Sequence, residues 1–194
     1  VRAFRRMGFP AKAIWVSLAF MLPIVGLMAS LWTSATQNIE FSAKERLGVS
    51  YGRALMGVLD AAQNRRRAAT VQAADLTEAQ ERVRHSMQTL SDVHQTLSPD
   101  LPDTVPAWQS VQDLNEALMA QPVKADANQT FAAHTAFVDA VMALLQDVMD
   151  QSNLTLDPDV DTYYLMDAAL FKQPHLIEQM GKMRGLGNKL IAMG

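Results

Sequence analysis

A long uncharged stretch near the N-terminus constrains this chain more than any other feature. Residues 13–39 contain no charged side chain, and Ile14–Trp32 is apolar except for two serines. As a helix, these 19 residues would match a bilayer core of about 30 Å. Tryptophans stand at or near both ends, at Trp15 and Trp32, where indole rings favour the membrane interface. The sequence therefore predicts a transmembrane helix over residues 14–32.

The basic residues before this stretch indicate its orientation. Because positive charge stays on the cytoplasmic side of a membrane helix, we expect residues 1–13 to be a cytoplasmic tail and residues 33–194 to be periplasmic, with the helix in the bacterial inner membrane. A cleavable signal peptide is the alternative, since small residues occur at Ala29 and at 33–35. The length of the apolar run and the helical pattern beyond it favour an uncleaved anchor. The basic residues of the tail are Arg2, Arg5, Arg6 and Lys12.

The composition of the remaining chain favours helices and excludes several classes of function. Ala, Leu, Met, Gln, Glu and Arg recur, all of which are good helix formers. The absence of cysteine excludes disulfides, thiolate metal sites and a cysteine nucleophile. Four of the 17 basic residues lie in the tail, which leaves 13 against 20 acidic residues. Such a domain lacks the concentrated basic face that binding of nucleic acid requires.

Apolar residues at spacings of three and four predict a series of amphipathic helices after the membrane segment. We expect a further helix, interrupted by Pro174, to follow them and to run to the C-terminus. Thr77 and Gln80 have capping-box spacing, and Asp126 is placed to cap the helix after it. The predicted fold is an all-α, elongated antiparallel bundle, which we expect to be incomplete at its C-terminus. The helices before the last one are expected over residues 34–73, 77–97, 106–120 and 127–155.

The acidic residues and histidines form no recognisable catalytic or metal-binding motif. Aspartates alternate over Asp157–Asp161 like the first ligands of a calcium loop, but Thr162 and Ala168 replace the Gly and Glu that such a loop needs. Helix capping by Asp157, with Pro158 in the first turn, explains this run better. The four histidines are isolated from one another. We therefore expect no catalytic residue, no metal and no cofactor in this segment, and hence no enzyme.

Three consecutive arginines, Arg65–Arg67, form the densest charge cluster beyond the tail. Consecutive helical residues point in different directions, so at least one of these side chains must turn toward the bundle. A buried arginine is costly unless an acid or a ligand pairs with it. Arg184 lies near glycines that leave space around it. Either the cluster is a solvated helix face, or Arg66, Arg67 and Arg184 approach one interhelical groove and clamp a carboxylate or nitrate-like anion.

Three longer runs carry a resemblance to a known family. They are FSAKERLGVSYGR at 41–53, SNLTLDPDVDTYYLMD at 152–167 and PHLIEQMGKMRGLG at 174–187. Together they resemble the periplasmic sensor region of bacterial methyl-accepting chemotaxis proteins, which also occurs in related membrane histidine kinases and diguanylate cyclases. The DPDxDxYYLMD pattern is fairly specific for this receptor group. Its Tyr163 joins the arginines as a candidate ligand-binding residue.

The resemblance implies a helical sensor anchored in the lipid bilayer. A second membrane helix, a HAMP linker and a cytoplasmic signalling domain would follow residue 194. Such a sensor binds a small molecule or a ligand-loaded binding protein, and we expect it to form a homodimer through its long first helix. The same sensor attached to a histidine kinase or a diguanylate cyclase is one alternative. A membrane-anchored helical adaptor that binds a protein partner is the other.

Overall fold

The described part of the chain is helical, as its content of strong helix formers predicts. The computed structural model describes residues 8–124, 126–156 and 160–193. No strand occurs within these ranges, so the all-α prediction is confirmed. The elements in chain order are α2 (Phe9–Thr70), α3 (Leu76–Leu97), the 3-10 helix η1 (Pro102–Thr104), α4 (Val105–Ala120), α5 (Ala127–Gln151), the 3-10 helix η2 (Leu154–Leu156), α6 (Val160–Met166), the π-helix η3 (Asp167–Lys172) and α7 (Gln173–Met193).

The chain divides into two units, Val1–Ala43 and Lys44–Gly194, and α2 contributes to both. In the first unit, α2 runs through Pro23 without a break. Its large apolar side chains are exposed, Leu22 to 73% and Leu31 to 70%. A continuous exposed apolar surface of this kind marks a site of interaction with a membrane or a protein.

Two of the described helices, α2 and α5, are long and apolar enough to cross a membrane. In α5, 44% of the most apolar stretch is buried, whereas none of the corresponding stretch of α2 is buried. The apolar character of α5 is therefore explained by its place in the bundle core. A membrane anchor and a signal sequence both have the length and composition of the apolar part of α2.

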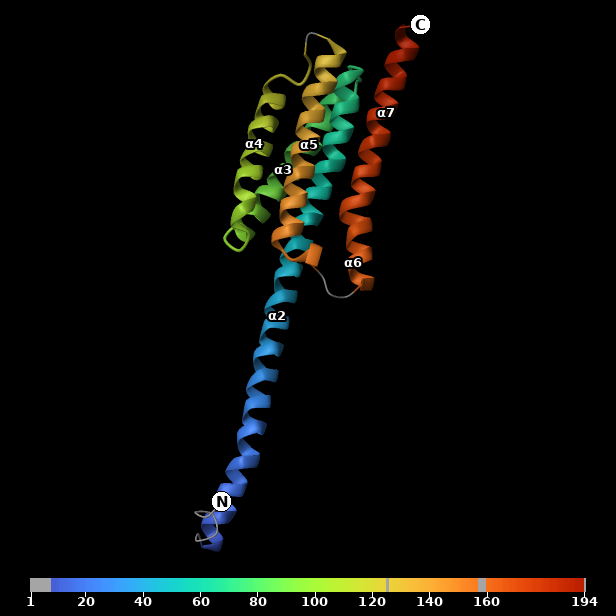
Figure 1. Ribbon diagram of the computed structural model, residues 1–194. Coiled ribbons are helices and arrows are strands. Elements are labelled where there is room, and N and C mark those ends of the chain that lie inside the picture. Colours follow the sequence, from blue (N-terminus) through green and yellow to red (C-terminus); the bar gives the residue numbers. More distant parts are fainter. Residues whose placement is uncertain (1–7, 125, 157–159, 194) are drawn as a thin grey trace. The chain divides into compact units, whose positions relative to one another are not determined.

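In the second unit, the part of α2 beyond Ala43 lies among α3, α4, α5 and α7, and successive helices alternate in direction (Figure 1). Side-chain contacts agree with these directions. Tyr51, early in this part of α2, hydrogen-bonds His94 near the end of α3. Arg66, late in α2, hydrogen-bonds Thr135 in the first half of α5. The predicted antiparallel bundle is confirmed.

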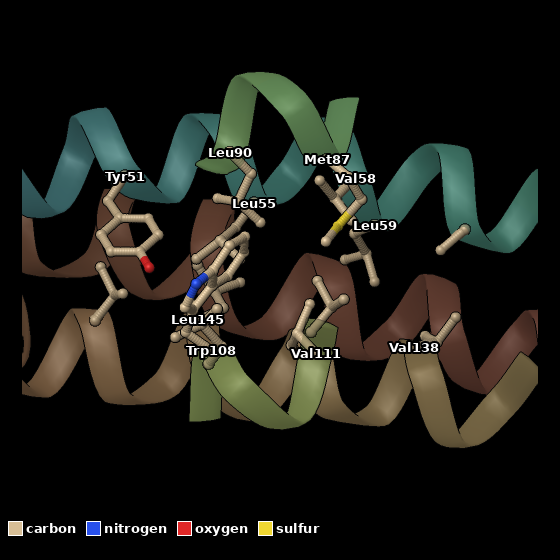
Figure 2. Close-up of a cluster of buried hydrophobic side chains, with 14 of the residues drawn as sticks. Tyr51, Leu55, Val58, Leu59, Met87, Leu90, Trp108, Val111, Val138 and Leu145 are labelled. Carbon is tan, nitrogen blue, oxygen red and sulfur yellow. The ribbon is translucent and has the colours of Figure 1, made fainter. Parts of the chain in front are cut away.

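Apolar residues of α2, α3, α4 and α5 form one core, and Figure 2 shows their side chains pointing toward one another. Burial of a large aliphatic or aromatic side chain contributes roughly 1.5–3 kcal/mol, so these contacts supply most of the cohesion among the four helices. Apolar residues that recur at helical spacings along these elements are buried here, among them Tyr51, Leu55, Val83, Leu90 and Val138.

The start of α3 differs from the sequence prediction. The capping box predicted at Thr77 and Gln80 is wrong, because α3 already begins at Leu76. Its N-cap residue, Asp75, makes no side-chain capping hydrogen bond. The Asp75 carboxylate pairs with Arg67 instead.

The cap predicted for α5 is confirmed, although the helix is shorter than expected. The Asp126 side chain accepts hydrogen bonds from the backbone N–H groups of Asn128 and Gln129. The helix ends at Gln151 rather than at residue 155, and Asn153 adopts a left-handed conformation with φ of 65°. Asparagine tolerates that conformation better than most residues, which ends the helix there.

Pro174 does not interrupt the last helical segment, contrary to the prediction. It lies in the first turn of α7, and α6, η3 and α7 follow one another directly. The segment immediately before it, η3, is a π-helix, in which backbone hydrogen bonds span five residues instead of four. The local change therefore precedes the proline and does not end the helix.

The face that the first half of α7 turns toward the bundle is not its apolar face. Between Gln173 and Gly185, the large apolar side chains are exposed, Leu176 to 61%, Met180 to 61% and Met183 to 71%. The inner positions follow spacings of four, three and four and hold a proline, a carboxylate and two glycines, namely Pro174, Glu178, Gly181 and Gly185.

Two sets of predictions concern residues outside the described ranges. These are the arginines of the tail, Arg2, Arg5 and Arg6, and the helix cap expected at Asp157 with Pro158.

Candidate functional site

A cavity of about 410 Å³ lies among α2, α5 and α7. Arg66 and Arg67 of α2 and Arg184 of α7 line it, so the structure brings three of the four candidate residues together. A mostly apolar wall with a few charged groups is typical of pockets for small organic molecules. We call this space the arginine cavity. Its other lining residues are Gln63, Thr70, Val71, Phe131, Ile177, Met180, Gly181 and Gly185.

Arg66 is buried and paired with an acid. Its Nη1 lies 2.6 Å from Oε1 of Glu178 and its Nη2 lies 2.8 Å from Oε2, which makes the pair bidentate. Nη1 also donates to Oγ1 of Thr135 at 3.1 Å. The guanidinium carbon lies 5.0 Å from the centroid of the Phe131 ring. These contacts tie α2 to both α5 and α7, and the charged hydrogen bonds are the strongest among them.

Other donors surround the Glu178 carboxylate. Nε2 of Gln63 donates to Oε2 at 3.1 Å, and Nζ of Lys182 lies 3.6 Å from Oε1. Lys182 also pairs with Asp139 of α5 at 2.9 Å. A second cavity of about 410 Å³ is lined by Glu178, Lys182 and Asp139 among others. Arg66 therefore lines the first cavity, and its partner Glu178 lines the second.

Arg67 and Arg184 are both exposed but differ in their partners. Arg67 pairs with Asp75, and this hydrogen bond lowers the pKa of the Asp75 carboxyl. Arg184 has no carboxylate partner among residues 8–124, 126–156 and 160–193. Of the arginines that line the cavity, Arg184 is thus the one whose charge is not already paired within the described chain.

Tyr163 does not line the arginine cavity. It lies in α6, half-buried, with its ring edge-to-face against Tyr164 at 5.7 Å between centroids. A role of Tyr163 in ligand binding stays a prediction, and the arginine cavity does not support it.

A glycine of α7 fixes one wall of the cavity. A Cβ at Gly185 would lie 2.7 Å from Cε2 of Phe131, closer than such atoms approach. The absence of a side chain therefore lets α7 come close to α5 at this point. Gly187 differs, because a Cβ there would meet no atom within 4 Å.

Two residues of this region are not singled out by the sequence pattern, Glu178 and Arg65. The sequence did offer a way to find Glu178. It is the one acidic residue among Pro174, Glu178, Gly181 and Gly185, which follow helical spacing along the inner side of α7. Arg65 carries no signal that distinguishes it within the cluster, because the two residues that follow it, Arg66 and Arg67, are also arginines. The side chain of Arg65 is nevertheless fully buried.

The surroundings of Arg65 compensate its charge poorly. Nη1 donates to Oδ1 of Asn115 at 3.2 Å, and the guanidinium carbon lies 4.9 Å from the centroid of the Phe137 ring. Among the described residues, neither Nε nor Nη2 has a hydrogen-bond partner. Burial lowers the pKa of Arg65 to about 10. The bundle therefore holds one buried cation without an acid beside it in the part of the chain that the structure describes.

His134 of α5 is a second buried polar residue near these arginines. Its Nε2 lies 2.8 Å from the carbonyl oxygen of Pro122, to which it donates a hydrogen bond. Burial, more than the positive charges of Arg65 and Arg66, lowers the pKa of His134 to about 4. The ring is therefore neutral near neutral pH.

The remaining histidines do not assemble with other ligand types. His94 packs against Trp108 with 4.8 Å between ring centroids and bonds the Tyr51 hydroxyl at 2.6 Å. His85 and His175 are exposed. Over the described ranges, no group of three or more metal-ligating side chains gathers.

Comparison of the chain with protein-family models, with curated proteins and with solved structures finds no match. The assignment of a function therefore depends on the geometry of the arginine cavity and on the resemblance of the three sequence runs.

Proposed function

We propose that this chain is the ligand-sensing part of a bacterial transmembrane receptor of the methyl-accepting chemotaxis type. The observation that carries the proposal is that three arginines from two helices line one cavity of about 410 Å³. An anion bound there contacts α2 and α7 together, so its binding favours one arrangement of these helices over another. Arg66 and the apolar stretch proposed as the membrane anchor belong to the same helix, α2.

The resemblance of the runs at 41–53, 152–167 and 174–187 supports the same proposal. The first run falls in α2 and the third in α7. The second begins directly after α5, includes η2 and α6, and ends at Asp167 of η3. Because histidine kinases and diguanylate cyclases share the resemblance, the sensor region of such an enzyme is the alternative. The chemotaxis receptor and the receptor enzyme differ in their output domains. Both proposals expect the arginine cavity to bind the ligand.

Binding of a simple anion tests the proposal. The full chain in lipid nanodiscs is titrated with sodium benzoate and with sodium nitrate by calorimetry. We expect Arg184→Gln to weaken benzoate binding at least about tenfold, because it removes a charge-assisted contact. The matched control is Arg82→Gln, at an exposed arginine of α3 that pairs with Glu78 and does not line the cavity. Unchanged affinity in Arg184→Gln, or no binding of either anion, contradicts the proposal.

The proposed membrane topology places residues 1–13 in the cytoplasm, residues 14–32 in the inner membrane and residues 33–194 in the periplasm. Since the chain lacks cysteine, single cysteines at Ala11 and Asn38 report accessibility without background. We expect an impermeant maleimide to label Asn38→Cys in intact cells and Ala11→Cys only after permeabilisation. Loss of residue 11 from the mature protein would instead identify a cleaved signal peptide.

The proposed homodimer uses the exposed face of α2. Cysteines on this face should cross-link between chains, whereas cysteines at the buried Tyr51 and Leu55 should not. Equal cross-linking at exposed and buried positions, or none at all, contradicts a dimer through α2. The exposed face follows helical spacing and consists of Arg46, Val49, Arg53, Gly57 and Asp60.

The exposed apolar residues of α6 and α7 favour a second candidate function, a membrane-anchored adaptor. Leu165 is 70% exposed and Met183 is 71% exposed, and exposed apolar patches mark protein interfaces. An adaptor of this kind needs no small ligand, so the anion titration separates the two candidates.

A further inference from the structure

We propose that Glu178 is a built-in competitor for the arginine cavity, and that the ligand is a monocarboxylate with an apolar body that displaces Glu178 from Arg66. This inference rests on the proposed function, because it assumes that the cavity binds an anion. It adds the class of ligand and the step by which binding changes the attachment of α7.

The lining of the cavity points to the class of ligand. Beside the arginines, the walls include the side chains of Phe131, Ile177 and Met180. An inorganic anion would leave these apolar walls without a partner, whereas an aromatic or aliphatic body fills them and is removed from water. The arginines then require one carboxylate at the polar end of the ligand.

Competition follows from the hydrogen bonds of Arg66. Both of its Nη atoms already donate to Glu178, at 2.6 and 2.8 Å. A bidentate interaction with a ligand carboxylate uses the same two donors. Arg66 therefore binds either Glu178 or the ligand in this geometry, while Arg184 is available to the ligand in both states.

The displaced carboxylate has a place and a partner. Glu178 lines the second cavity of about 410 Å³, which shares no lining residue with the arginine cavity. Lys182 lines that cavity too, and its Nζ is already 3.6 Å from Oε1 of Glu178. The other partner of Lys182, Asp139, is 54% exposed and remains hydrated if the lysine moves.

The exchange therefore leaves no buried charge alone. The ligand replaces Glu178 on Arg66, and Lys182 takes the Glu178 carboxylate. An uncompensated buried ion would cost several kcal/mol, and this arrangement avoids that cost. Its consequence is that α7 loses its buried ion pair with α2 when the ligand binds.

Removal of the competing charge tests the inference. The full chain in nanodiscs is titrated with benzoate, with benzyl alcohol and with nitrate, in the wild type and in Glu178→Gln. We expect Glu178→Gln to bind benzoate at least about tenfold more tightly, because Arg66 no longer has to leave an internal carboxylate. Benzyl alcohol and nitrate should bind far more weakly than benzoate. Glu81→Gln, which removes an exposed acid paired with Arg84, is the control that should match the wild type.

A second variant keeps the Arg66–Glu178 pair and removes the alternative partner. Lys182→Met should weaken benzoate binding severalfold, although Lys182 does not line the arginine cavity. If Glu178→Gln fails to fold, Lys182→Met still tests the exchange. Weaker benzoate binding by Lys182→Met supports the exchange, and unchanged benzoate binding overturns it.

The outcomes separate this inference from the proposed function. If the wild type binds benzoate and Glu178→Gln binds it equally or more weakly, the exchange is wrong and the anion site stands. Binding of benzoate by Glu178→Gln alone overturns the exchange, because the ligand then does not displace Glu178 in the wild type. If neither protein binds benzoate, both proposals are overturned. If nitrate binds as tightly as benzoate, the proposal that the ligand has an apolar body is wrong.

Discussion

The Arg66 guanidinium and the Glu178 carboxylate form a bidentate ion pair between residues that are 112 positions apart in the sequence. Their side chains are 4% and 1% exposed. The pair joins α2 to α7, whose large apolar side chains between Gln173 and Gly185 are exposed. Over this part of α7, attachment to the bundle therefore depends on charge pairing and close backbone approach more than on apolar burial.

Removal of either charge should destabilise the second unit. We expect Glu178→Met to lower the free energy of unfolding by about 3–5 kcal/mol, because it leaves Arg66 buried without an acid. Arg66→Met should cost less, since Gln63 and Lys182 remain beside Glu178. The Arg66→Met, Glu178→Met double variant should regain most of the loss, because neither charge remains. Urea unfolding followed by circular dichroism measures these values, and additive losses in the double variant would contradict a paired interaction.

Removal of the Arg65 charge should have the opposite effect on stability, because no acid compensates this charge within the described chain. Arg65→Met should raise the free energy of unfolding by on the order of 1–3 kcal/mol, because the variant no longer buries a cation. The neighbouring Arg67→Met is the matched control. Arg67 is exposed and its pair with Asp75 lies at the surface, so a change of within about 0.5 kcal/mol is expected. Destabilisation by Arg65→Met would show that Asn115 and the Phe137 ring compensate the charge well.

The helices of the bundle could be predicted because their burial follows from local periodicity. Residues such as Leu55, Leu90 and Val138 repeat at spacings of three and four and are buried, since apolar burial needs no specific partner. The cap at Asp126 was equally local and correct. The cap predicted at Thr77 is wrong because α3 begins before it, at Leu76, and the carboxylate of the N-cap residue Asp75 pairs with Arg67 of α2.

The site was only partly predictable, since its polar residues depend on partners distant in the sequence. The pattern predicted that at least one of the three arginines turns inward, and Arg65 and Arg66 do. It did not predict which of them meets an acid, because Glu178 belongs to α7. The inner face of α7 was obscured by the more conspicuous apolar residues at Leu176 and Met183, which are exposed.

Gly185 offers a test of the shape of the arginine cavity. Gly185→Ala places a Cβ 2.7 Å from Cε2 of Phe131, so α7 or the ring must move and the cavity changes. We expect benzoate affinity to fall about tenfold or more relative to Gly187→Ala. Both substitutions gain the same helix propensity of about 1 kcal/mol, and a Cβ at Gly187 meets no atom within 4 Å. Equal affinities of the two variants, measured by calorimetry, would mean that Phe131 is not a wall of the ligand site.

His134 should make the stability of the bundle depend on pH. Its pKa in the folded protein is about 4, whereas a histidine in an unfolded chain has a pKa of about 6.5. Between these values the unfolded state binds more protons, so the free energy of unfolding falls as the pH falls from about 6.5 to about 4. The loss reaches up to about 3 kcal/mol and does not grow below that window, where both states are protonated.

His134→Gln tests this dependence, because its amide nitrogen can still donate to the carbonyl of Pro122 but does not titrate. Urea unfolding over this pH range should show a shallower dependence in His134→Gln than in the wild type. A smaller dependence should remain, since burial also lowers the pKa of His94. The exposed His85 provides the control, and His85→Gln should keep the wild-type slope. Equal slopes in the wild type and in His134→Gln would mean that burial does not lower the pKa of this ring in the folded protein.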